Sequence, residues 1–502
     1  MKSKVLLIQP KNTLSLNVYP PLNLIQVGSA LQSNGYEVKI ITCPTVRDCE
    51  SVILNECSDA LFVGIGVLTP EVPNAIEIAK RIKREYNIPI VWGGWHSTLF
   101  SEQMIQSRLV DKIIIDEGDS SIIRVAEEYR NTSRKSYGKN KVVSNIHKLD
   151  MEQLTCPDYG LVPNIELYIN SSLTDKFLEY DSRKVRWLPY QSSRGCPSFC
   201  TFCINVVTDN RKYRRKSAIK VADEIETIVY THKINHLKII DDNFFVNIES
   251  IKEIANKMIE RKLGITWDAE CRVDYFNDKI MNDDCLELLV KSGLNELTFG
   301  IESGSRRTLE IMKKGITPEQ SIYAVKKSSE FGIVSRCSLI IDVPGEEKED
   351  IFETVKLVNK IRKIPKTMCG VHTYRPYPKS ELCEKLLNEG IISQPKTFEE
   401  WSKKEFVEQF TYASVKRKWQ KNYKLSSNIS YFQNLESGFW IAPHQIHNIL
   451  IRKVNGFFMK ISKIRNSKLY YKNVIDRYIY MLFKFVFYKY KEWKNEASNT
   501  NK

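Results

Sequence analysis

Two blocks of alternating short apolar runs and amphipathic segments constrain the fold of this 502-residue chain more than any other feature. In the first block the pattern predicts strands at 5–8, 38–41, 60–67 and 88–92, with helices at 21–33 and 72–86. In the second it predicts strands at 187–191, 237–240, 266–269, 296–300, 338–343 and 370–374, with helices at 218–231, 248–261, 283–291, 318–331 and 348–361. The strands are apolar throughout, as expected when helices cover both faces of a parallel sheet.

This alternation predicts an α/β protein with two successive architectures. Residues 1–145 are expected to form a doubly wound, Rossmann-like parallel sheet. Residues 146–185 lack clear periodicity and are interpreted as a linker that packs between domains. Residues 186–390 are expected to form a partial (β/α)6 barrel like an open TIM barrel, and residues 391–502 a basic, mostly helical region.

Composition limits the class of protein. The hydrophobic content of 42% is typical of globular chains, and no apolar stretch reaches the ~18–20 residues of a transmembrane helix. Because the sequence shows no export signal, we expect a cytoplasmic protein. Three of its twelve cysteines lie within eight residues, and in a reducing cytosol such a group is expected to bind metal rather than form disulfides.

The net charge of +15 is concentrated at the C-terminus, where residues 391–502 hold 21 Lys or Arg against 8 Asp or Glu. Aromatic and apolar residues are interleaved with these charges, as at 455–460 and 478–490. One interpretation is an amphipathic helix at the inner face of a membrane. The other is a helical cap over the barrel mouth with a solvated basic face. Nucleic acid is not expected, because no recognised binding module is present.

Glycines follow several strands of the first block, where ligands bind in doubly wound sheets. A glycine lets the backbone approach a ligand closely, although each one alone is as typical of a simple turn. Their recurrence at corresponding strand ends predicts a ligand-binding face. Its candidate residues are Gly64, Gly66, Gly93, Gly94, Glu117 and Gly118.

Cys196, Cys200 and Cys203 follow the first predicted barrel strand at spacings of four and three. A structural zinc site is the alternative interpretation, but such a site uses four ligands, and the next cysteine is Cys271. Iron–sulfur clusters also commonly take four cysteines. Three thiolates would leave one iron open, which suits a catalytic centre better than a structural one.

The C-x3-C-x2-C spacing, with the aromatic Phe202 before the last cysteine, resembles the signature of radical S-adenosylmethionine (SAM) enzymes. The resemblance implies that Cys196, Cys200 and Cys203 bind a [4Fe–4S] cluster whose fourth iron chelates SAM. It also implies an electron donor such as flavodoxin or ferredoxin. Reductive cleavage of SAM in this family yields a 5′-deoxyadenosyl radical that abstracts a substrate hydrogen.

Later strand ends resemble the same family. Residues 240–245 are similar to its D-D-x-F element, 267–272 to its W-x4-R element and 299–305 to its G-I-E-S-G segment. The resemblance implies that SAM contacts Phe202, Asp242, Arg272, Glu302 and Ser303. One departure is Asp342, where related sequences usually have the glycine that lies against adenine. The sequence assigns no catalytic residue.

A doubly wound domain directly before this barrel is similar to the cobalamin-dependent branch of the superfamily. The matching pieces are residues 19–22, 35–38, 93–96 and 116–119. The resemblance implies that the six candidate residues of the ligand-binding face hold cobalamin. The D-x-H-x-x-G motif of classical cobalamin domains is absent. His96 is therefore either a residue of the pocket or a structural histidine.

These features lead to a functional hypothesis and two alternatives. The first is a cobalamin-dependent C-methyltransferase that acts on an unactivated carbon of a small molecule, either a lipid or a secondary metabolite. The second keeps both cofactors but performs ring closure, rearrangement or carbon–carbon coupling. The third is a non-catalytic membrane- or nucleic-acid-binding protein with a structural metal. The substrate has no readable code in the sequence.

Overall fold

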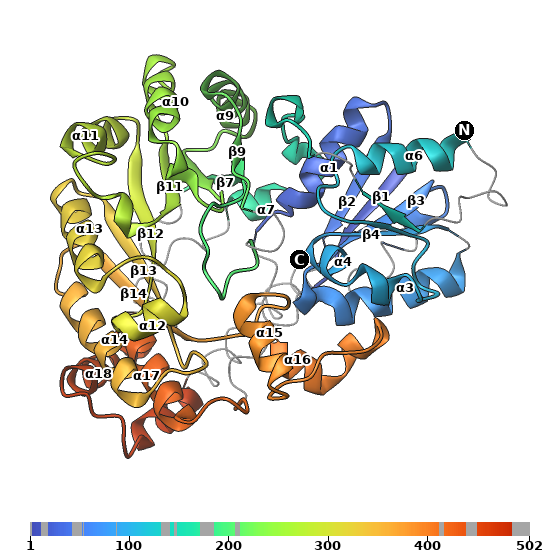
Figure 1. Cartoon of the computed structure of the whole chain (residues 1–502). Helices are drawn as coiled ribbons and strands as arrows, with labels where there is room; N and C mark the ends of the chain where they lie inside the picture. The colour runs from blue at the N-terminus through green and yellow to red at the C-terminus, as the bar shows by residue number, and fades with distance from the viewer. Residues whose placement is uncertain are drawn as a thin grey trace.

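The computed structural model describes residues 3–11, 19–42, 53, 55–86, 88–131, 141–144, 148–170, 185–205, 211–410, 416–437 and 449–483. Two six-stranded parallel sheets lie next to each other, the N-terminal sheet at the right of Figure 1 and the second at the left. Helices cover both sheets, and further helices follow at the C-terminus. The predicted α/β fold class is confirmed.

The N-terminal sheet has the strand order β2-β1-β3-β4-β5-β6. This order reverses beside β1, which creates the crevice at the carboxyl ends where ligands bind in doubly wound sheets. The strands predicted from the apolar runs are all present, and β5 and β6 extend the sheet. The bounds are β1 Lys4–Gln9, β2 Glu37–Thr42, β3 Phe62–Gly66, β4 Ile90–Gly93, β5 Lys112–Ile114 and β6 Val142–Val143.

Helices lie on both faces of this sheet (Figure 1). On one face, α1 (Leu22–Ser33) and α6 (Ser121–Asn131) bury apolar side chains in a core that continues into the second sheet. On the other face lie α3 (Val72–Glu85) and α4 (Trp95–Leu99). In α3 the residues Val72, Ala75, Ile76, Ala79 and Ile82 recur at helical spacing, so one stripe of the helix is buried.

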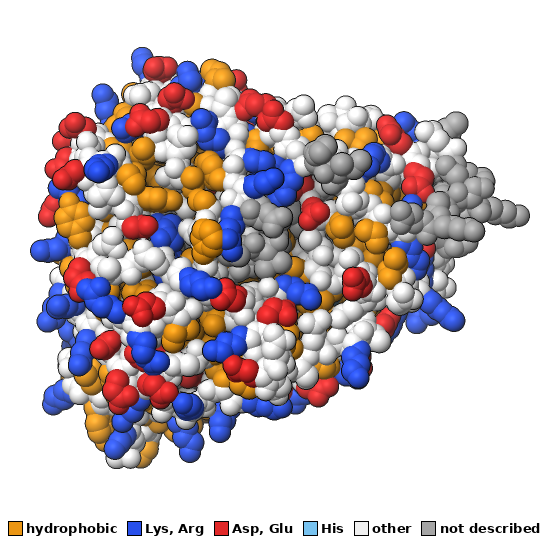
Figure 2. Space-filling model, in the orientation of Figure 1, with side chains coloured by type: hydrophobic (Ala, Val, Ile, Leu, Met, Phe, Trp, Pro, Cys, Tyr) orange, Lys and Arg blue, Asp and Glu red, His pale blue; other side chains and the backbone are white. Residues whose placement is uncertain are grey.

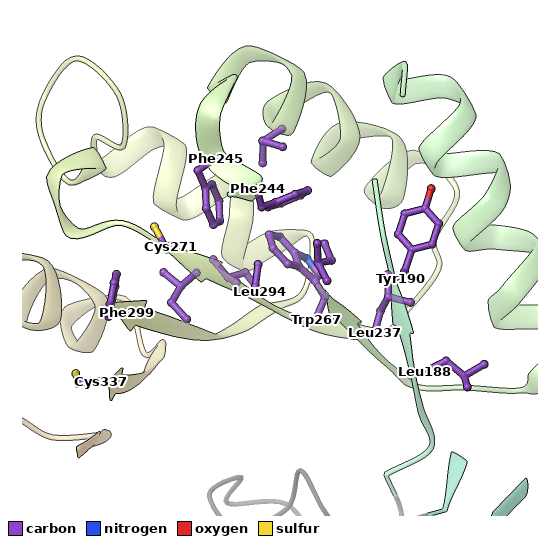
Figure 3. Close-up of a cluster of buried hydrophobic side chains, with 14 of the residues drawn as sticks. Leu188, Tyr190, Leu237, Phe244, Phe245, Trp267, Cys271, Leu294, Phe299 and Cys337 are labelled. Atoms are coloured by element: carbon purple, nitrogen blue, oxygen red, sulfur yellow. The ribbon is translucent and has the colours of Figure 1, made fainter. Parts of the chain in front are cut away.

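The second sheet has the order β14-β13-β12-β11-β10-β7 and is open, because β14 and β7 do not pair. Its strands are β7 Trp187–Tyr190, β10 His236–Ile239, β11 Thr266–Cys271, β12 Leu294–Glu302, β13 Val334–Ile341 and β14 Thr367–Thr373. The helices outside it are α9 Ala218–His232, α10 Ile248–Glu260, α11 Asp283–Lys291, α13 Pro318–Glu330 and α14 Lys348–Ile361. Alternate side chains such as Trp267, Cys271 and Phe299 belong to the core between strands and helices (Figure 3).

The described part of the segment interpreted as a linker contacts both sheets. Gln26 of α1 donates to the Thr155 carbonyl, and Ser29 accepts from the Asp158 amide, both at 2.8 Å. The buried Tyr159 hydroxyl donates to the Pro189 carbonyl of β7. Residues 171–184 lie outside the described residues.

Residues 381–410 pack under the N-terminal sheet rather than on the barrel alone. Here α15 (Glu381–Asn388), a 3-10 helix (Glu399–Ser402) and α16 (Lys404–Phe410) share one apolar core with the α3 face. The rings of Trp92 and Phe398 meet edge to face with centroids 5.0 Å apart. In Figure 1 these helices lie below α3 and α4. The predicted boundary at residue 390 therefore falls inside a segment that joins the two sheets.

The last described helices cover an edge of the second sheet that would otherwise be exposed to solvent. α17 (Tyr423–Glu436) and α18 (Ile449–Ser467) pack beside β14 and α14. The Asn434 side chain accepts from the Val371 amide at 2.9 Å and donates to its carbonyl at 2.8 Å. The Asn434 side chain thus occupies backbone groups of β14 that a further strand would otherwise bind. This protects β14 from pairing with another chain. A helical cap over the barrel mouth is one interpretation of the sequence, whereas the described helices α17 and α18 cover the edge of the sheet at β14. Residues 438–448 and 484–502 lie outside the described residues.

Several apolar side chains on α18 and the segment after it face solvent, among them Phe457, Ile475, Tyr478 and Leu482. Lys and Arg side chains are frequent along the lower edge of the molecule in Figure 2. Within the described residues, no helix combines the length and the apolar character needed to cross a membrane.

Asn434→Ala is expected to lower the free energy of unfolding by about 1–3 kcal/mol, because the buried Val371 amide then loses its acceptor. Urea unfolding monitored by circular dichroism measures this loss. Asn388→Ala, at an exposed end of α15, is the matched control and should stay close to the wild type. Equal midpoints for the two variants would contradict the role of Asn434.

Candidate active site

A pocket of about 520 Å³ lies where the carboxyl ends of the N-terminal strands meet the second sheet. Gln9 of β1, Gly66 of β3 and Gly93 of β4 line it from the first sheet. Pro189 and Ile240 line it from the first two strands of the second sheet. One cavity is thus shared by both sheets, at the edge where each is expected to bind its ligand.

All six predicted residues of the ligand-binding face line this pocket, but the glycines serve different purposes. A Cβ atom at Gly64 or Gly66 would come within 2.7 or 2.8 Å of Leu7 or Leu24, so these two glycines allow internal packing. Gly94 has a φ of +90° and approaches the Val67 backbone, which only glycine tolerates. At Gly93 a Cβ would meet nothing within 4 Å, so a side chain there would enter open space of the pocket.

Four charged side chains from two domains, all largely shielded from water, form a connected group at one side of the pocket. Arg194, in the short strand β8 (Ser193–Arg194), pairs with Asp119 at 2.8 Å and with Glu117 at 3.3 Å. Arg214, in β9 (Arg214–Arg215), also pairs with Glu117. We call Glu117, Asp119, Arg194 and Arg214 the interdomain charge cluster. The predicted pocket residue Glu117 is therefore already bound to two guanidinium groups of the barrel.

Cys196, Cys200 and Cys203 lie on the loop between β8 and β9, and none is in a disulfide. Burial raises the pKa of the Cys203 thiol to about 11 and also raises that of Cys200, and the neighbouring thiols add to both shifts. Asn243 donates to the Cys196 sulfur at 3.6 Å and to the Tyr275 hydroxyl at 2.8 Å. Such hydrogen bonds to sulfur are a means of tuning an iron–sulfur centre.

The two aspartates of the D-D-x-F element have separate roles. Asp241 is buried and accepts from the Ser192 and Ser193 hydroxyls at 2.5 and 2.6 Å, which positions the start of the cysteine loop. Asp242 lines the pocket. Its carboxylate accepts from the Gly195 amide at 3.0 Å and from Asn205 at 2.7 Å, on either side of the three cysteines.

The predicted residues Glu302 and Arg272 meet at Lys314. Glu302 ends β12 with a φ of +64°, and its carboxylate pairs with Lys314 at 2.9 Å. Arg272 donates to the Lys314 carbonyl at 2.8 Å and binds Asp274 through two nitrogens at 3.0 Å. Lys314 also lies 5.9 Å from the ring centre of Phe202. These five predicted or neighbouring groups thus form one connected set beside the cysteine loop.

Ser303 is placed differently from the other predicted residues. Its buried hydroxyl bonds to the Thr354 hydroxyl of α14 at 2.8 Å and accepts from the Ser305 amide at 3.1 Å. Both partners belong to the protein, so the hydroxyl stabilises the turn after β12. The resemblance offered no signal for this, because Thr354 lies 51 residues further along the chain.

His96 is a structural histidine in this fold and does not line the pocket. It is fully buried against Phe100 and Trp401, with ring centroids 5.0 and 4.9 Å away. Burial lowers the pKa of His96 to about 3, so the ring is neutral at ordinary pH. Its Nδ1 atom contacts the Thr69 hydroxyl at 3.2 Å. The helix after Gly94 turns His96 toward the C-terminal aromatic residues.

Asp342 keeps the backbone conformation that a glycine would adopt, with a φ of +66°. Its side chain accepts from Gln420 at 2.8 Å, and its carbonyl accepts from the Trp419 indole at 3.2 Å. Burial raises the pKa of Asp342 to about 6. The side chain thus holds the C-terminal segment at the end of β13.

Sequence reasoning missed several residues of this site. Two of them, Asn243 and Lys314, lie close to predicted positions but belong to no recognised motif. The others, Asp119, Arg194 and Arg214, interact only once the two domains are brought together. Arginine directly before Gly195-Cys196 was the available signal, since a charged side chain beside a buried loop needs a partner.

The residues present fit both implied cofactors. Three free thiols on one loop supply the donors of a cluster, each able to bind a different iron. Among the described residues, no three His, Cys, Asp or Glu side chains converge on a single ion. In the pocket, the open space at Gly93 and the buried Gln9 Oε1, which has no hydrogen-bond partner among the described residues, fit a ligand with an apolar body and amide groups.

Glu71 makes stability depend on pH. It lines the pocket with 4% of its surface exposed and accepts from the Leu68 amide at 2.8 Å. Burial raises its pKa from 4.5 to about 7, so its ionisation destabilises the fold progressively as pH rises through this interval. Glu71→Gln is therefore expected to add up to about 3 kcal/mol at pH 8 and almost nothing at pH 4.5. Thermal melts across this range, with the exposed Glu77→Gln as control, measure the difference.

Comparison with known proteins agrees with this geometry. The profile of the Radical SAM superfamily matches residues 190–358, and that of the B12 binding domain matches residues 13–126. An uncharacterized methyltransferase of Pyrococcus horikoshii is 28% identical over 415 residues, which cover 78% of this chain and 84% of that protein. The anaerobic magnesium-protoporphyrin IX monomethyl ester cyclase of Rubrivivax gelatinosus is 26% identical, covering 73% of this chain and 66% of the cyclase.

Among solved structures, the fold is similar to that of the radical SAM methyltransferase TsrM from Kitasatospora setae, determined with cobalamin and a [4Fe–4S] cluster. The TM-score is 0.61 at 17% identity, and the match covers 79% of this chain and 76% of TsrM. The two profile matches fall within the two regions whose sheets share the pocket. The chain therefore belongs to the radical SAM superfamily of enzymes and carries a B12 binding domain before its radical SAM domain.

Proposed function

We propose that this enzyme transfers a methyl group to an unactivated carbon of a small-molecule substrate, with cobalamin as the methyl carrier. The observation that carries the proposal is the shared pocket, because Gly93 of the B12 binding domain and Asp242 beside the cysteine loop line the same cavity. The methyltransferase names of the Pyrococcus and Kitasatospora proteins support the proposal.

In this proposal, Cys196, Cys200 and Cys203 hold the [4Fe–4S] cluster, and Phe202, Asp242, Arg272 and Glu302 surround SAM. When bound, the cluster supplies the electron that cleaves SAM, and cobalamin supplies the methyl group. The protein holds the reacting groups at fixed positions and excludes water. Lys314 offsets the charge of Glu302 beside the cysteine loop, and the oxygens of this carboxylate can accept from hydroxyl groups of a ligand.

We place the corrin over the strand ends that carry Gly64, Gly66, Gly93, Gly94 and Gly118. Among the described residues no histidine lines the pocket, so this part of the chain would offer no imidazole to a corrin bound there. The reducing partner, a flavodoxin or ferredoxin, and membrane contact through the basic C-terminal region stay predictions. The lipid or secondary-metabolite nature of the substrate stays a prediction as well.

Gly93→Leu tests the corrin site, because its side chain is expected to fill pocket space without disturbing the protein. After anaerobic reconstitution with hydroxocobalamin and gel filtration, the wild type should retain at least about ten times as much corrin as this variant. A factor of ten corresponds to a loss of about 1.4 kcal/mol in binding free energy. Gly456→Leu is the matched control, since a Cβ there also meets nothing within 4 Å but lies on α18. Equal corrin absorbance in both variants would refute the placement.

Methyl transfer is separated from ring closure by product mass. Holoenzyme incubated with a low-molecular-weight cell extract and SAM carrying a deuterated methyl group should yield a product that has gained that methyl group. A product that lacks the label, formed while SAM is cleaved, would instead support the cyclase alternative suggested by the Rubrivivax relative. Cys203→Ala should abolish SAM cleavage in both cases.

A further inference from the structure

The loop that carries the three cysteines is closed at its base by β8 and β9. These short antiparallel strands pair Ser193 with Arg215 and Arg194 with Arg214. The cysteine loop thus begins after Arg194 and ends before Arg214, which are paired with each other. Both arginines of the interdomain charge cluster therefore lie at the base of the loop. Whatever positions the two arginines also positions the base of the cysteine loop.

The partners of these arginines belong to the other domain. Asp119 binds the Arg194 guanidinium through both oxygens, at 2.8 and 3.3 Å, in the forked geometry that suits an arginine and a carboxylate. Glu117 lies between the two arginines and contacts both. Arg214 also donates to the Leu149 carbonyl at 2.8 Å. Residues 116–119, which follow β5, are thereby tied to the base of the cysteine loop.

This connection is firm because the charges are largely removed from water. The side chains of Arg194, Glu117 and Asp119 are 14%, 13% and 7% exposed. Loss of one partner of these pairs would leave a largely buried charge uncompensated, which is strongly unfavourable.

Three members of the cluster also face the cavity. Glu117, Asp119 and Arg194 line the pocket, while Arg214 does not. A ligand in the pocket would therefore contact residues 116–119 directly, and the charge pairs connect these residues to the base of the cysteine loop. Because coupling between two binding sites is reciprocal, a loaded cysteine loop must favour the ligand of the pocket by the same factor.

We propose that the interdomain charge cluster couples the two cofactor sites, so that a corrin in the pocket stabilises the iron–sulfur cluster and the cluster strengthens corrin binding. Arg194 and Arg214 act as positioning residues and need no contact with substrate. The inference rests on the proposed function, because it takes the occupant of the pocket to be a corrin. The inference adds that binding of corrin in the pocket and binding of the iron–sulfur cluster at the cysteine loop are not independent.

Iron release to a chelator tests this coupling on the reconstituted holoenzyme. With hydroxocobalamin bound, the wild type should release iron at least about fivefold more slowly than without it. Arg214→Gln should abolish most of this difference while retaining corrin, because Arg214 does not line the pocket. Arg214→Lys, which keeps the positive charge, should restore part of the difference in iron-release rate. Arg306→Gln removes an exposed arginine paired with Glu319 and is the matched control.

The reciprocal measurement uses corrin affinity in protein with and without the cluster. Cluster loading should tighten corrin binding in the wild type and should have little effect in Arg214→Gln. If Arg214 had a purely structural role, Arg214→Gln would lower the melting temperature. It would leave unchanged both the ratio of iron-release rates with and without corrin and the ratio of corrin affinities with and without the cluster. That outcome would overturn the inference.

The possible failures are distinguishable. Wild-type protein that retains no corrin would overturn the proposed function together with the coupling. Wild-type protein that retains corrin but releases iron at the same rate with and without it would overturn the coupling alone. Full coupling in Arg214→Gln would show that the interdomain charge cluster does not carry it.

Discussion

The pairing of buried charges between the two domains is the constraint on which the site depends. An arginine keeps its proton under all ordinary conditions, so burial of Arg194 at the rim of the pocket requires carboxylates from the facing domain. Asp119 and Glu117 supply them, and this sets the orientation of the N-terminal strand ends toward the cysteine loop. The same principle operates within the barrel, where Lys314 and Glu302 neutralise each other beside the cysteines.

The C-terminal region completes the structure in two places rather than forming a separate domain. Phe398 and Trp401 close the aromatic core around His96 under the N-terminal sheet. Asn434 occupies the hydrogen-bonding groups of Val371 on the edge strand of the barrel. Between them, Gln420 holds Asp342 at the end of β13, so the side chain of a residue with positive φ serves as an attachment point for this region.

Much of the fold was predictable because local pattern and global architecture agree. Apolar runs without alternation correctly predicted the buried parallel strands, and helical spacing predicted the helices that cover them. The glycines at the N-terminal strand ends were predicted to line a ligand site, and all of them line the pocket. The predictions were weaker for side-chain roles: Ser303 binds Thr354 and His96 packs among aromatic rings, because their partners lie far away in sequence.

The sequence alone determined the α/β class, the order of the two sheets and the three thiols, since periodicity and spacing are local properties. The tertiary structure alone decided that both sheets open into one cavity and that Glu117 binds two arginines. It also decided that a basic C-terminal region covers the edge and the underside of the sheets. These outcomes depend on contacts between residues tens to hundreds of positions apart, and no local pattern records which buried charge will meet which partner.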